Sequence, residues 1–425
     1  MACELYSCEN GVHILMSEIN SAQNCSFCKT TPEKDKPQVI SPDGQASVCG
    51  NCSSIIADAF SSQLSDVSKK PKKAFPRRTP RELLAVLNES IVGQDEPKKK
   101  VALAVYNHFK RLNAMESNSE IVFGKSNLLL LGPTGSGKTL VAETLARALD
   151  VPFVIGDANT LTAAGYVGGD VETLIKRLIE QAGGDIKRAE QGIIFLDEID
   201  KICRKSENPS ITRDVSGEDV QQALLKMIEG SEMQIPTNGG GRRHPSAPTE
   251  TINTKNILFI CAGAFPHLEK QLKDKSLNQK IGFSASFDDD KDCSVDMSNV
   301  STDDLVKCGL IPELIGRLPI VSTFSHLDKK DLVRILTEPK DSLINQYKQM
   351  LRMEGVDCHF SPEYLDKVAE ISLEKKIGAR GLRSIVEKSL QELLFDAPEI
   401  GPASVLIGPG IIEDPYNYSL DEKAA

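Results

Sequence analysis

A glycine-rich segment of the chain carries the residue types that bind phosphate groups. It matches the pattern G-x-x-x-x-G-K-[ST] in full, with Gly132, Pro133, Thr134, Gly135, Ser136, Gly137, Lys138 and Thr139. Glycines let backbone N–H groups turn inward around phosphate oxygens, and the N-terminus of a following helix adds partial positive charge. Lys138 would then reach the β- and γ-phosphates of a nucleotide, and Thr139 would ligate Mg²⁺. A glycine-rich turn arising by chance is the alternative, but this segment follows an apolar run and opens a helical pattern, as the motif requires.

Two adjacent carboxylates, Asp197 and Glu198, follow a second apolar run at residues 192–196. The run has the pattern of a buried strand, which would deliver Asp197 to the metal end of the phosphate site. Glu198 would then orient and deprotonate an attacking water molecule. The alternative is a strand that simply ends in an acidic turn. With the phosphate loop upstream, the pair indicates hydrolysis of ATP rather than binding alone.

The cysteines predict a metal site. Six of the 11 cysteines lie in the first 52 residues, and four of them form two C-x-x-C pairs: Cys25, Cys28, Cys49 and Cys52. Each pair presents two thiolates from a small turn, and together they would hold Zn²⁺ in a closed tetrahedral site of structural type. In a reducing compartment, paired local cysteines indicate a metal rather than disulfides. Zinc ribbons also occur in nucleic-acid-binding proteins, so the metal alone does not identify the partner.

These residues require an α/β scaffold. Apolar runs at 126–131, 192–196 and 256–261 have the pattern of buried strands, and helical patterns such as 139–149 alternate with them. Strands that alternate with helices predict a parallel sheet covered on both faces. Beyond about residue 325 the strand patterns become rare, and Ser361 followed by Pro362 is typical of a helix start. We therefore expect a P-loop α/β domain followed by a small, mainly helical domain.

The chain of 425 residues is long enough for several domains. We expect an N-terminal extension at 1–22, a zinc-binding module at 23–58, a basic flexible linker at 59–80, a large ATPase domain at 81–324 and a small C-terminal domain at 325–425. The linker assignment rests on its Lys, Ser and Pro content, which leaves too few apolar residues for a core. Met16 is a possible alternative start of translation.

The segment Asp197-Glu198-Ile199-Asp200-Lys201 and its flanking elements resemble the AAA+ family, and stretches from about residue 25 nearly to the C-terminus resemble the ClpX unfoldases in particular. The resemblance implies that Ile91 and Val92 pack on adenine. It implies that Arg317, within residues 310–319, is an arginine finger that reaches the γ-phosphate on a neighbouring subunit. It also implies that Arg380, within residues 378–383, is a nucleotide sensor, and that the protein is a homohexamer with ATP at its interfaces. From the residues alone, Arg317 could equally form a surface ion pair.

The same resemblance assigns roles to several loops. Tyr166 and Val167, between two glycines, resemble a pore loop that grips the substrate, and residues 213–218 resemble a second pore loop. Three basic residues resemble a loop at the pore entrance, with Arg in the middle position where the family has Lys: Arg242, Arg243 and His244. A tripeptide in a polar stretch resembles the loop that docks on the ClpP peptidase: Ile281, Gly282 and Phe283. Read without the family, these segments could be a turn with a buried Tyr, a solvated basic loop and an exposed docking motif.

The resulting hypothesis is an ATPase that unfolds tagged or adaptor-delivered proteins, moves them through a hexameric pore and delivers them to ClpP, without being a peptidase itself. ATP, Mg²⁺ and Zn²⁺ are the expected cofactors. The alternative is a nucleic-acid-remodelling AAA+ ATPase with a zinc ribbon. The chain has 60 acidic and 50 basic residues, and this net charge of −10 argues against broad nucleic-acid binding. No apolar run is long enough for a membrane helix and no secretory signal is evident, so we expect a cytoplasmic protein.

Overall fold

The computed structural model describes residues 5–7, 13–15, 24–31, 38–41, 45–56, 78–116, 124–162, 169–203, 217–236, 249–272 and 300–421. The chain divides into two compact units, Met1–Ala74 and Phe75–Ala425. Among the described residues, no helix is long and apolar enough to cross a membrane.

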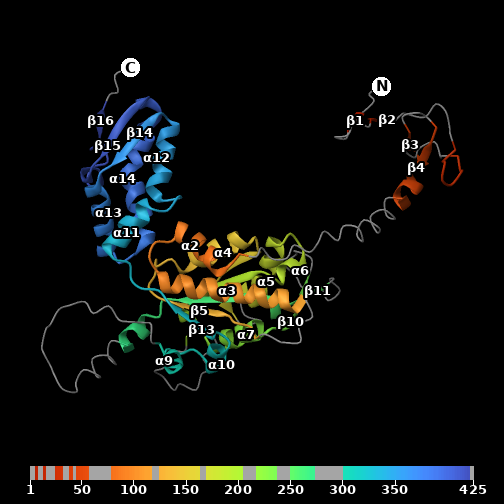
Figure 1. Cartoon of the computed structure of the whole chain (residues 1–425), viewed down its shortest axis with the longest axis horizontal. Helices are drawn as coiled ribbons and strands as arrows, with labels where there is room; N and C mark the ends of the chain where they lie inside the picture. Colours follow the sequence, from red (N-terminus) through yellow and green to blue (C-terminus); the bar gives the residue numbers. More distant parts are fainter. Residues whose placement is uncertain are drawn as a thin grey trace. The chain divides into compact units, whose positions relative to one another are not determined.

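A five-stranded parallel sheet forms the centre of the second unit (Figure 1). Its strand order is β13-β5-β12-β9-β6, and all of its neighbouring strands pair in parallel. The strands are β5 (Leu128–Leu131), β6 (Phe153–Asp157), β9 (Ile193–Asp197), β12 (Leu258–Gly263) and β13 (Ile320–Thr323). The predicted α/β fold with a parallel sheet is confirmed. The bounds of the third predicted strand differ: β12 begins at Leu258, after the short 3-10 helix η3 (Thr254–Asn256), and extends to Gly263, beyond the predicted end at residue 261.

Successive side chains of the strands point alternately into two separate cores, one on each face of the sheet. In β5, Leu128 and Leu130 join the core beneath α2, α3 and α4, whereas Leu129 and Leu131 join the core beneath α5 and α7. This alternation follows from the pleat of a strand, and it requires apolar residues at every position when both faces are covered. In Figure 1, α3 and α4 lie above β5, and α7 and α10 lie below it.

The helices around the sheet begin and end at recognisable sequence signals. Helix α2 (Pro80–Ser90) starts with a capping box, in which the Thr79 hydroxyl accepts from the Glu82 N–H and the Glu82 carboxylate accepts from the Thr79 N–H. The other helices are α3 (Asp95–Glu116), α4 (Lys138–Leu149), α5 (Val171–Gln181), α6 (Ile186–Ala189), α7 (Glu218–Glu229), α9 (Thr302–Lys307) and α10 (Pro312–Gly316).

Shorter elements complete this region. They are the 3-10 helices η1 (Ala158–Thr160) and η2 (Ile199–Ile202), the parallel pair β7 (Leu161–Thr162) and β8 (Gly169–Asp170), and the antiparallel pair β10 (Glu232–Pro236) and β11 (Thr249–Asn253).

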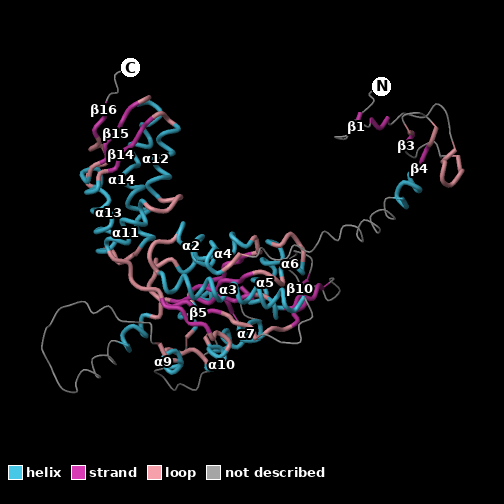
Figure 2. The backbone as a smooth tube through the Cα atoms, viewed as in Figure 1, coloured by secondary structure: helices cyan, strands magenta, loops and turns pink. Residues whose placement is uncertain are grey.

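The C-terminal part has its own core of four helices and a small sheet (Figure 2). The helices are α11 (Lys329–Thr337), α12 (Leu343–Met353), α13 (Pro362–Glu374) and α14 (Ala379–Ile400). Helix α13 begins where the sequence predicted, with the Ser361 hydroxyl accepting from the Tyr364 N–H at 3.2 Å. The three-stranded sheet, which the sequence did not predict, pairs β14 (Val356–Phe360) with β15 (Ala403–Ile407) and β15 with β16 (Ser419–Asp421), and the short helix η5 (Pro409–Ile412) lies between the last two strands.

The described residues of the N-terminal unit form two short antiparallel pairs and one helical segment. The pairs are β1 (Leu5–Ser7) with β2 (His13–Leu15), and β3 (Gln38–Ile40) with β4 (Ser47–Cys49). Residues 50–56 are helical. No repeating pattern in the sequence predicted β1 and β2. Most of the predicted linker lies outside the described residues.

Candidate functional site

The glycine-rich segment connects the end of β5 to the start of α4. Gly132, Gly135 and Gly137 have φ values of 142°, 78° and 96°, a region that side chains with a Cβ rarely adopt. A Cβ on Gly132 would lie 2.5 Å from the carbonyl oxygen of Phe324, and one on Gly135 would lie 2.8 Å from that of Ile377. The loop therefore passes so close to two distant segments that only glycine fits at these positions.

Lys138 points back into this loop. Its ammonium group is buried and donates to the carbonyl oxygens of Gly132 at 2.7 Å and Pro133 at 2.8 Å. The Ser136 hydroxyl is also buried, and it makes no hydrogen bond with any residue that the structure describes. A buried cation and an unpartnered hydroxyl within a loop of this shape fit the phosphate groups of a nucleotide.

The predicted metal ligands and the predicted base meet at the same edge of the sheet. The Thr139 hydroxyl donates to the Asp197 carboxylate at 3.3 Å, so the two predicted Mg²⁺ ligands are in contact. Glu198 has a left-handed backbone, with φ of 57°, and its N–H donates to the other Asp197 oxygen at 2.9 Å. This turn leaves the Glu198 side chain exposed, whereas Asp197 is only partly exposed.

The charges around Lys138 identify two more residues of the site. The pKa of Lys138 is lowered to about 8, chiefly by burial; the charge of Asp197 opposes this fall, and the charge of Arg380 adds to it. Arg380, from the start of α14, therefore lies close enough to Lys138 to influence its charge, and its role as a nucleotide sensor stays a prediction. Asp200 also raises the pKa of Lys138, and its carboxylate accepts from the Ala264 N–H at 3.2 Å. Asp200 had no predicted role, although it stands three residues after Asp197.

A pocket of about 470 Å³ lies beside Ile91 and Val92, the residues expected to contact adenine. Both are buried, and the pocket is also lined by Lys98 from α3 and by Arg334 from α11. Lys98 donates to the Ile91 carbonyl at 3.2 Å and pairs with Asp95 at the same distance. The sequence did not single out Lys98, because a lysine on an ordinary helix carries no distinguishing pattern.

The large and small parts of the second unit meet around this site. The Gln94 amide donates to the Ser325 carbonyl at 2.9 Å and accepts from the Ser325 N–H at 3.0 Å. A Cβ on Gly378 would lie 2.9 Å from the Thr134 carbonyl, so the start of α14 touches the phosphate loop directly.

Arg317 lies at the other edge of the sheet. In the register of β13 with β5, Ile320 pairs with Leu128 and Thr323 pairs with Leu131. The phosphate loop follows Leu131, whereas Arg317 precedes Ile320. Since a strand rises about 3.3 Å per residue, the length of the strand separates the two. The structure thus does not bring Arg317 to the phosphate loop of its own chain. Instead, its guanidinium forms an exposed ion pair with Glu229, at 3.0 Å from Nε and 2.9 Å from Nη2.

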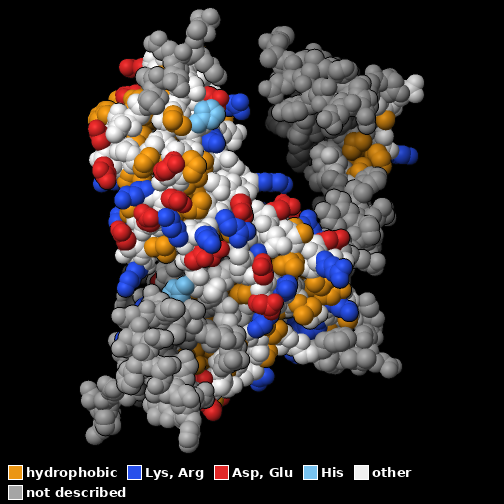
Figure 3. Space-filling model, turned by 60° about the vertical axis from the view of Figure 1, so that its left-hand side comes forward, with side chains coloured by type: hydrophobic (Ala, Val, Ile, Leu, Met, Phe, Trp, Pro, Cys, Tyr) orange, Lys and Arg blue, Asp and Glu red, His pale blue; other side chains and the backbone are white. Residues whose placement is uncertain are grey.

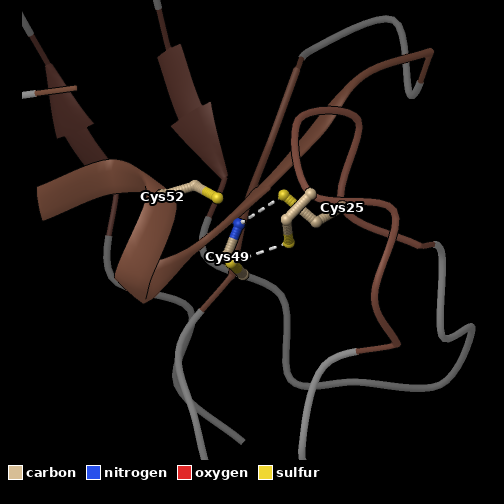
Figure 4. Close-up of side chains that lie close together, drawn as sticks. Cys25, Cys49 and Cys52 are labelled. Atoms are coloured by element: carbon tan, nitrogen blue, oxygen red, sulfur yellow. Dashed lines mark hydrogen bonds between the residues drawn. The ribbon is translucent and has the colours of Figure 1, made fainter. Parts of the chain in front are cut away.

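The four predicted cysteine ligands converge in the N-terminal unit. The sulfur atoms of Cys25, Cys28, Cys49 and Cys52 all lie within 4.8 Å of one another. Cys49 is the last residue of β4, and Cys52 lies in the helical segment that follows. Figure 4 shows the sulfurs of Cys25, Cys49 and Cys52 turned toward a common centre.

The electrostatics of this cluster fit a divalent cation. Hydrogen bonds from the backbone N–H groups of Cys28 and Cys49 lower the pKa of Cys25 to about 6. The neighbouring sulfurs, Cys28 first and Cys49 next, raise the pKa of Cys52 to about 12. A bound Zn²⁺ would relieve this repulsion, because a coordinating thiol is deprotonated by the metal.

The remaining predicted loops lie outside the described residues. They comprise the first pore loop (Tyr166, Val167), the pore-entrance loop (Arg242, Arg243, His244), the docking tripeptide (Ile281, Gly282, Phe283) and most of the second pore loop.

On the described surface shown in Figure 3, acidic and basic side chains are interspersed and form no continuous basic face. This arrangement offers no broad track for a nucleic-acid backbone on that side.

Two family models match the chain. The AAA domain (Cdc48 subfamily) matches residues 124–321, and the C-terminal D2-small domain of the ClpB protein matches residues 327–403. The ATP-dependent Clp protease ATP-binding subunit ClpX of Treponema denticola is 46% identical over 416 residues, which is 96% of this chain and 99% of the relative. The protein of the same name from Borrelia duttonii is 46% identical over 384 residues, covering 90% of this chain and 89% of the relative.

The lowered pKa of Lys138 predicts that nucleotide affinity depends on pH. The ammonium is charged below pH 8 and loses its proton as the pH rises through about 8. Phosphate oxygens favour the charged form, so the Kd for ATP should rise by up to about tenfold per pH unit above that value. Fluorescent-nucleotide titration between pH 7 and 9 measures this. Lys138→Arg, whose guanidinium stays charged, should lose the pH dependence. An equal slope in that variant would assign the titration to another group.

The cysteine cluster predicts one zinc ion per chain. Cys49→Ser in the full-length protein should remove most of the zinc, because it deletes one of four ligands. ATPase activity should persist, since the cluster and the phosphate loop belong to different compact units. Elemental analysis beside an ATPase assay checks both results, with Cys308→Ser as the control outside the cluster. Wild-type protein that is purified under reducing conditions and carries no zinc would refute the site.

Proposed function

Because the chain belongs to the ClpX family of AAA ATPases, we propose that it uses ATP hydrolysis to unfold tagged or adaptor-delivered proteins and passes them to the ClpP peptidase. The chain is an ATPase and not itself a peptidase. The observation that carries the proposal is the convergence of Lys138, Thr139 and Asp197 at one edge of the sheet, with Glu198 exposed beside them.

In this proposal each residue of the phosphate site has a separate task. Lys138 and the loop N–H groups hold the β- and γ-phosphates, and Thr139 and Asp197 hold Mg²⁺. When bound, Mg²⁺ supplies neutralisation of the phosphate charge. Glu198 accepts the proton of the attacking water, and its exposed carboxylate beside Asp197 is suited to that task. Ile91 and Val92 bind the adenine.

The contact between the phosphate loop and the start of α14 supports a coupling of nucleotide state to movement. Arg380 affects the pKa of Lys138, and Gly378 lies against Thr134. A change in the conformation of the phosphate loop would therefore displace the start of α14 in the small domain. The position of Arg317 at the sheet edge opposite its own phosphate loop supports a role on the nucleotide of another chain. A ring of identical subunits, for which the family implies six, would bring Arg317 of one chain to the nucleotide of the next.

Substrate handling is assigned from the resemblance of the loops. Tyr166 and Val167 grip the polypeptide in the pore, and the basic residues Arg242, Arg243 and His244 attract its C-terminal carboxylate at the entrance. The zinc-binding module receives adaptors and some substrates. The tripeptide Ile281, Gly282 and Phe283 docks on ClpP.

The nucleic-acid-remodelling alternative predicts stimulation of ATP hydrolysis by DNA. The net charge of −10 and the mixed surface of Figure 3 favour the protein-unfolding proposal instead. A direct comparison is an ATPase assay with an unfoldable tagged protein in one arm and DNA in the other. Stimulation by the protein arm supports the proposal, and stimulation by DNA alone would reverse it.

Replacing the proposed base tests the hydrolytic step. Glu198→Gln should bind ATP with near-normal affinity but hydrolyse it about 10²- to 10⁴-fold more slowly, because the amide cannot accept the proton. Nucleotide binding and phosphate release are measured on the same preparation. Glu143→Gln, at a partly exposed glutamate of α4 that pairs with Arg147, is the matched control. Near-normal turnover in Glu198→Gln would rule out its role as the base.

Removing the docking anchor tests the partnership with ClpP. One Phe side chain buried in a partner contributes only about 1.5–3 kcal/mol, but six tethered copies in a ring multiply the effect. Phe283→Ala should therefore abolish degradation in the presence of ClpP while unfolding and ATPase activities continue. Unfolding and degradation of the same substrate are compared, with Ser284→Ala as the neighbouring control. Loss of both activities would identify Phe283 as a core residue, and undiminished degradation would place the docking site elsewhere.

A further inference from the structure

The ion pair between Arg317 and Glu229 joins two segments that are far apart in the sequence. Both Nε and Nη2 of Arg317 lie close to the same oxygen, Oε1 of Glu229, at 3.0 and 2.9 Å. Glu229 is the last residue of α7, and Arg317 directly follows α10. One edge of the guanidinium is thus held by the carboxylate, and Nη1 is left outside this bond.

The backbone that carries Arg317 is firmly anchored. Its carbonyl accepts from the amide of Asn127 at 3.0 Å, and the Asn127 oxygen accepts from the Phe259 N–H at 3.2 Å. Asn127, the residue directly before β5 in the sequence, is buried, and Leu318 is fully buried in the core. The position of the Arg317 backbone is therefore fixed to β5 and β12, and only its long side chain is left to be oriented.

Helix α7 is fixed to the α10 segment at its other end as well. Gln221, fully buried in the first turn of α7, accepts from the Ile311 N–H at 2.8 Å, directly before α10. The same side chain donates to the carbonyls of Ile202 at 2.7 Å and Gly309 at 3.1 Å. Both ends of α7 therefore contact the segment that ends in Arg317.

The C-terminal end of α7 is itself held in place. Lys125 donates to the Ile228 carbonyl at 3.0 Å, and the Thr254 hydroxyl donates to the Met227 carbonyl at 2.8 Å. Gly230 follows with φ of 102°, where a Cβ would lie 2.9 Å from Lys255. The carboxylate of Glu229 thus extends from a rigid helix end rather than from a mobile loop.

We propose that Glu229 is a positioning residue, which holds the Arg317 guanidinium in the orientation that lets it reach the nucleotide of a neighbouring subunit. The inference rests on the proposed function of Arg317 as an arginine finger. An arginine side chain has many rotamers, and fixing it beforehand lowers the cost of placing its remaining N–H groups on a phosphate. An exposed ion pair contributes little to folding stability, so the Arg317–Glu229 pair is better explained by the orientation that it gives to the guanidinium.

The test compares variants of Glu229 in the full-length protein by steady-state ATP hydrolysis. Glu229→Ala should lower kcat by about 10- to 100-fold, the cost of a misplaced catalytic group, and leave KM for ATP nearly unchanged. Glu229→Gln keeps the length and an accepting oxygen and should retain most of the activity. Glu229→Asp keeps the charge but is shorter, and should fall below Glu229→Gln. The comparison of Glu229→Gln with Glu229→Asp tests the inference even if the Ala variant fails to fold.

A double variant separates positioning from a general structural role. Arg317→Ala should lower kcat by about 10³-fold or more, as removal of an arginine finger does. Adding Glu229→Ala to Arg317→Ala should cause no further fall, because Glu229 acts through Arg317. Phosphate release from radiolabelled ATP measures these low rates. Glu370→Ala, which breaks an exposed ion pair with Lys329 in the small domain, is the matched control and should behave like wild type.

Each other outcome overturns the inference in a distinct way. If Glu229→Ala had a normal kcat while Arg317→Ala was slow, Arg317 would remain the arginine finger and Glu229 would have no role in positioning it. A further fall in the double variant would show that Glu229 acts independently of Arg317. Normal kcat in Arg317→Ala would overturn the proposed role of Arg317 and the positioning role of Glu229 together.

Discussion

The burial of one positive charge governs the arrangement of the whole ATPase region. An ammonium group inside a protein is costly unless polar groups surround it. Here two carbonyls of the phosphate loop accept its hydrogen bonds, and the acids at 197 and 200 raise a pKa that burial lowers. The left-handed glycines give the loop the shape in which these carbonyls reach Lys138, at the start of α4 and at the sheet edge where the phosphate site lies.

The same loop is also the place where two folded parts of the chain meet. Gly135 and Gly378 leave no room for a side chain between the phosphate loop and the start of α14. The side-chain amide of Gln94 holds the segment after β13, because it both donates to and accepts from the backbone of Ser325. Such a contact would pass a displacement of the phosphate loop on to the small domain, because a packed interface transmits small displacements instead of absorbing them.

The opposite edge of the sheet imposes a different requirement. In a parallel sheet, the N-terminal ends of the strands lie along one edge and the C-terminal ends along the opposite edge. An arginine before β13 and a phosphate loop after β5 therefore cannot meet within one chain. The chain has Lys138, Thr139, Asp197 and Glu198 at one edge and Arg317 at the other. This polarity of the sheet gives a physical reason for an assembly in which one subunit completes the site of the next.

The local patterns were readable from the amino-acid sequence. The phosphate loop, the Asp197–Glu198 pair and the two C-x-x-C pairs are each set by residues close together in the chain, and runs of apolar residues predicted the parallel sheet.

The β14–β15–β16 sheet escaped prediction because its strands are short and amphipathic and stand among strong helical patterns. Asp200 and the Glu229–Arg317 pair escaped it because their contacts join segments that only the folded chain brings together. Lys98 escaped it because a lysine on an ordinary helix carries no distinguishing pattern. The sequence by itself thus determined which residue types the candidate site contains, because its motifs are contiguous. Only the tertiary structure decided which edge of the sheet each charged group occupies, since strand order and register depend on packing between residues far apart in the chain.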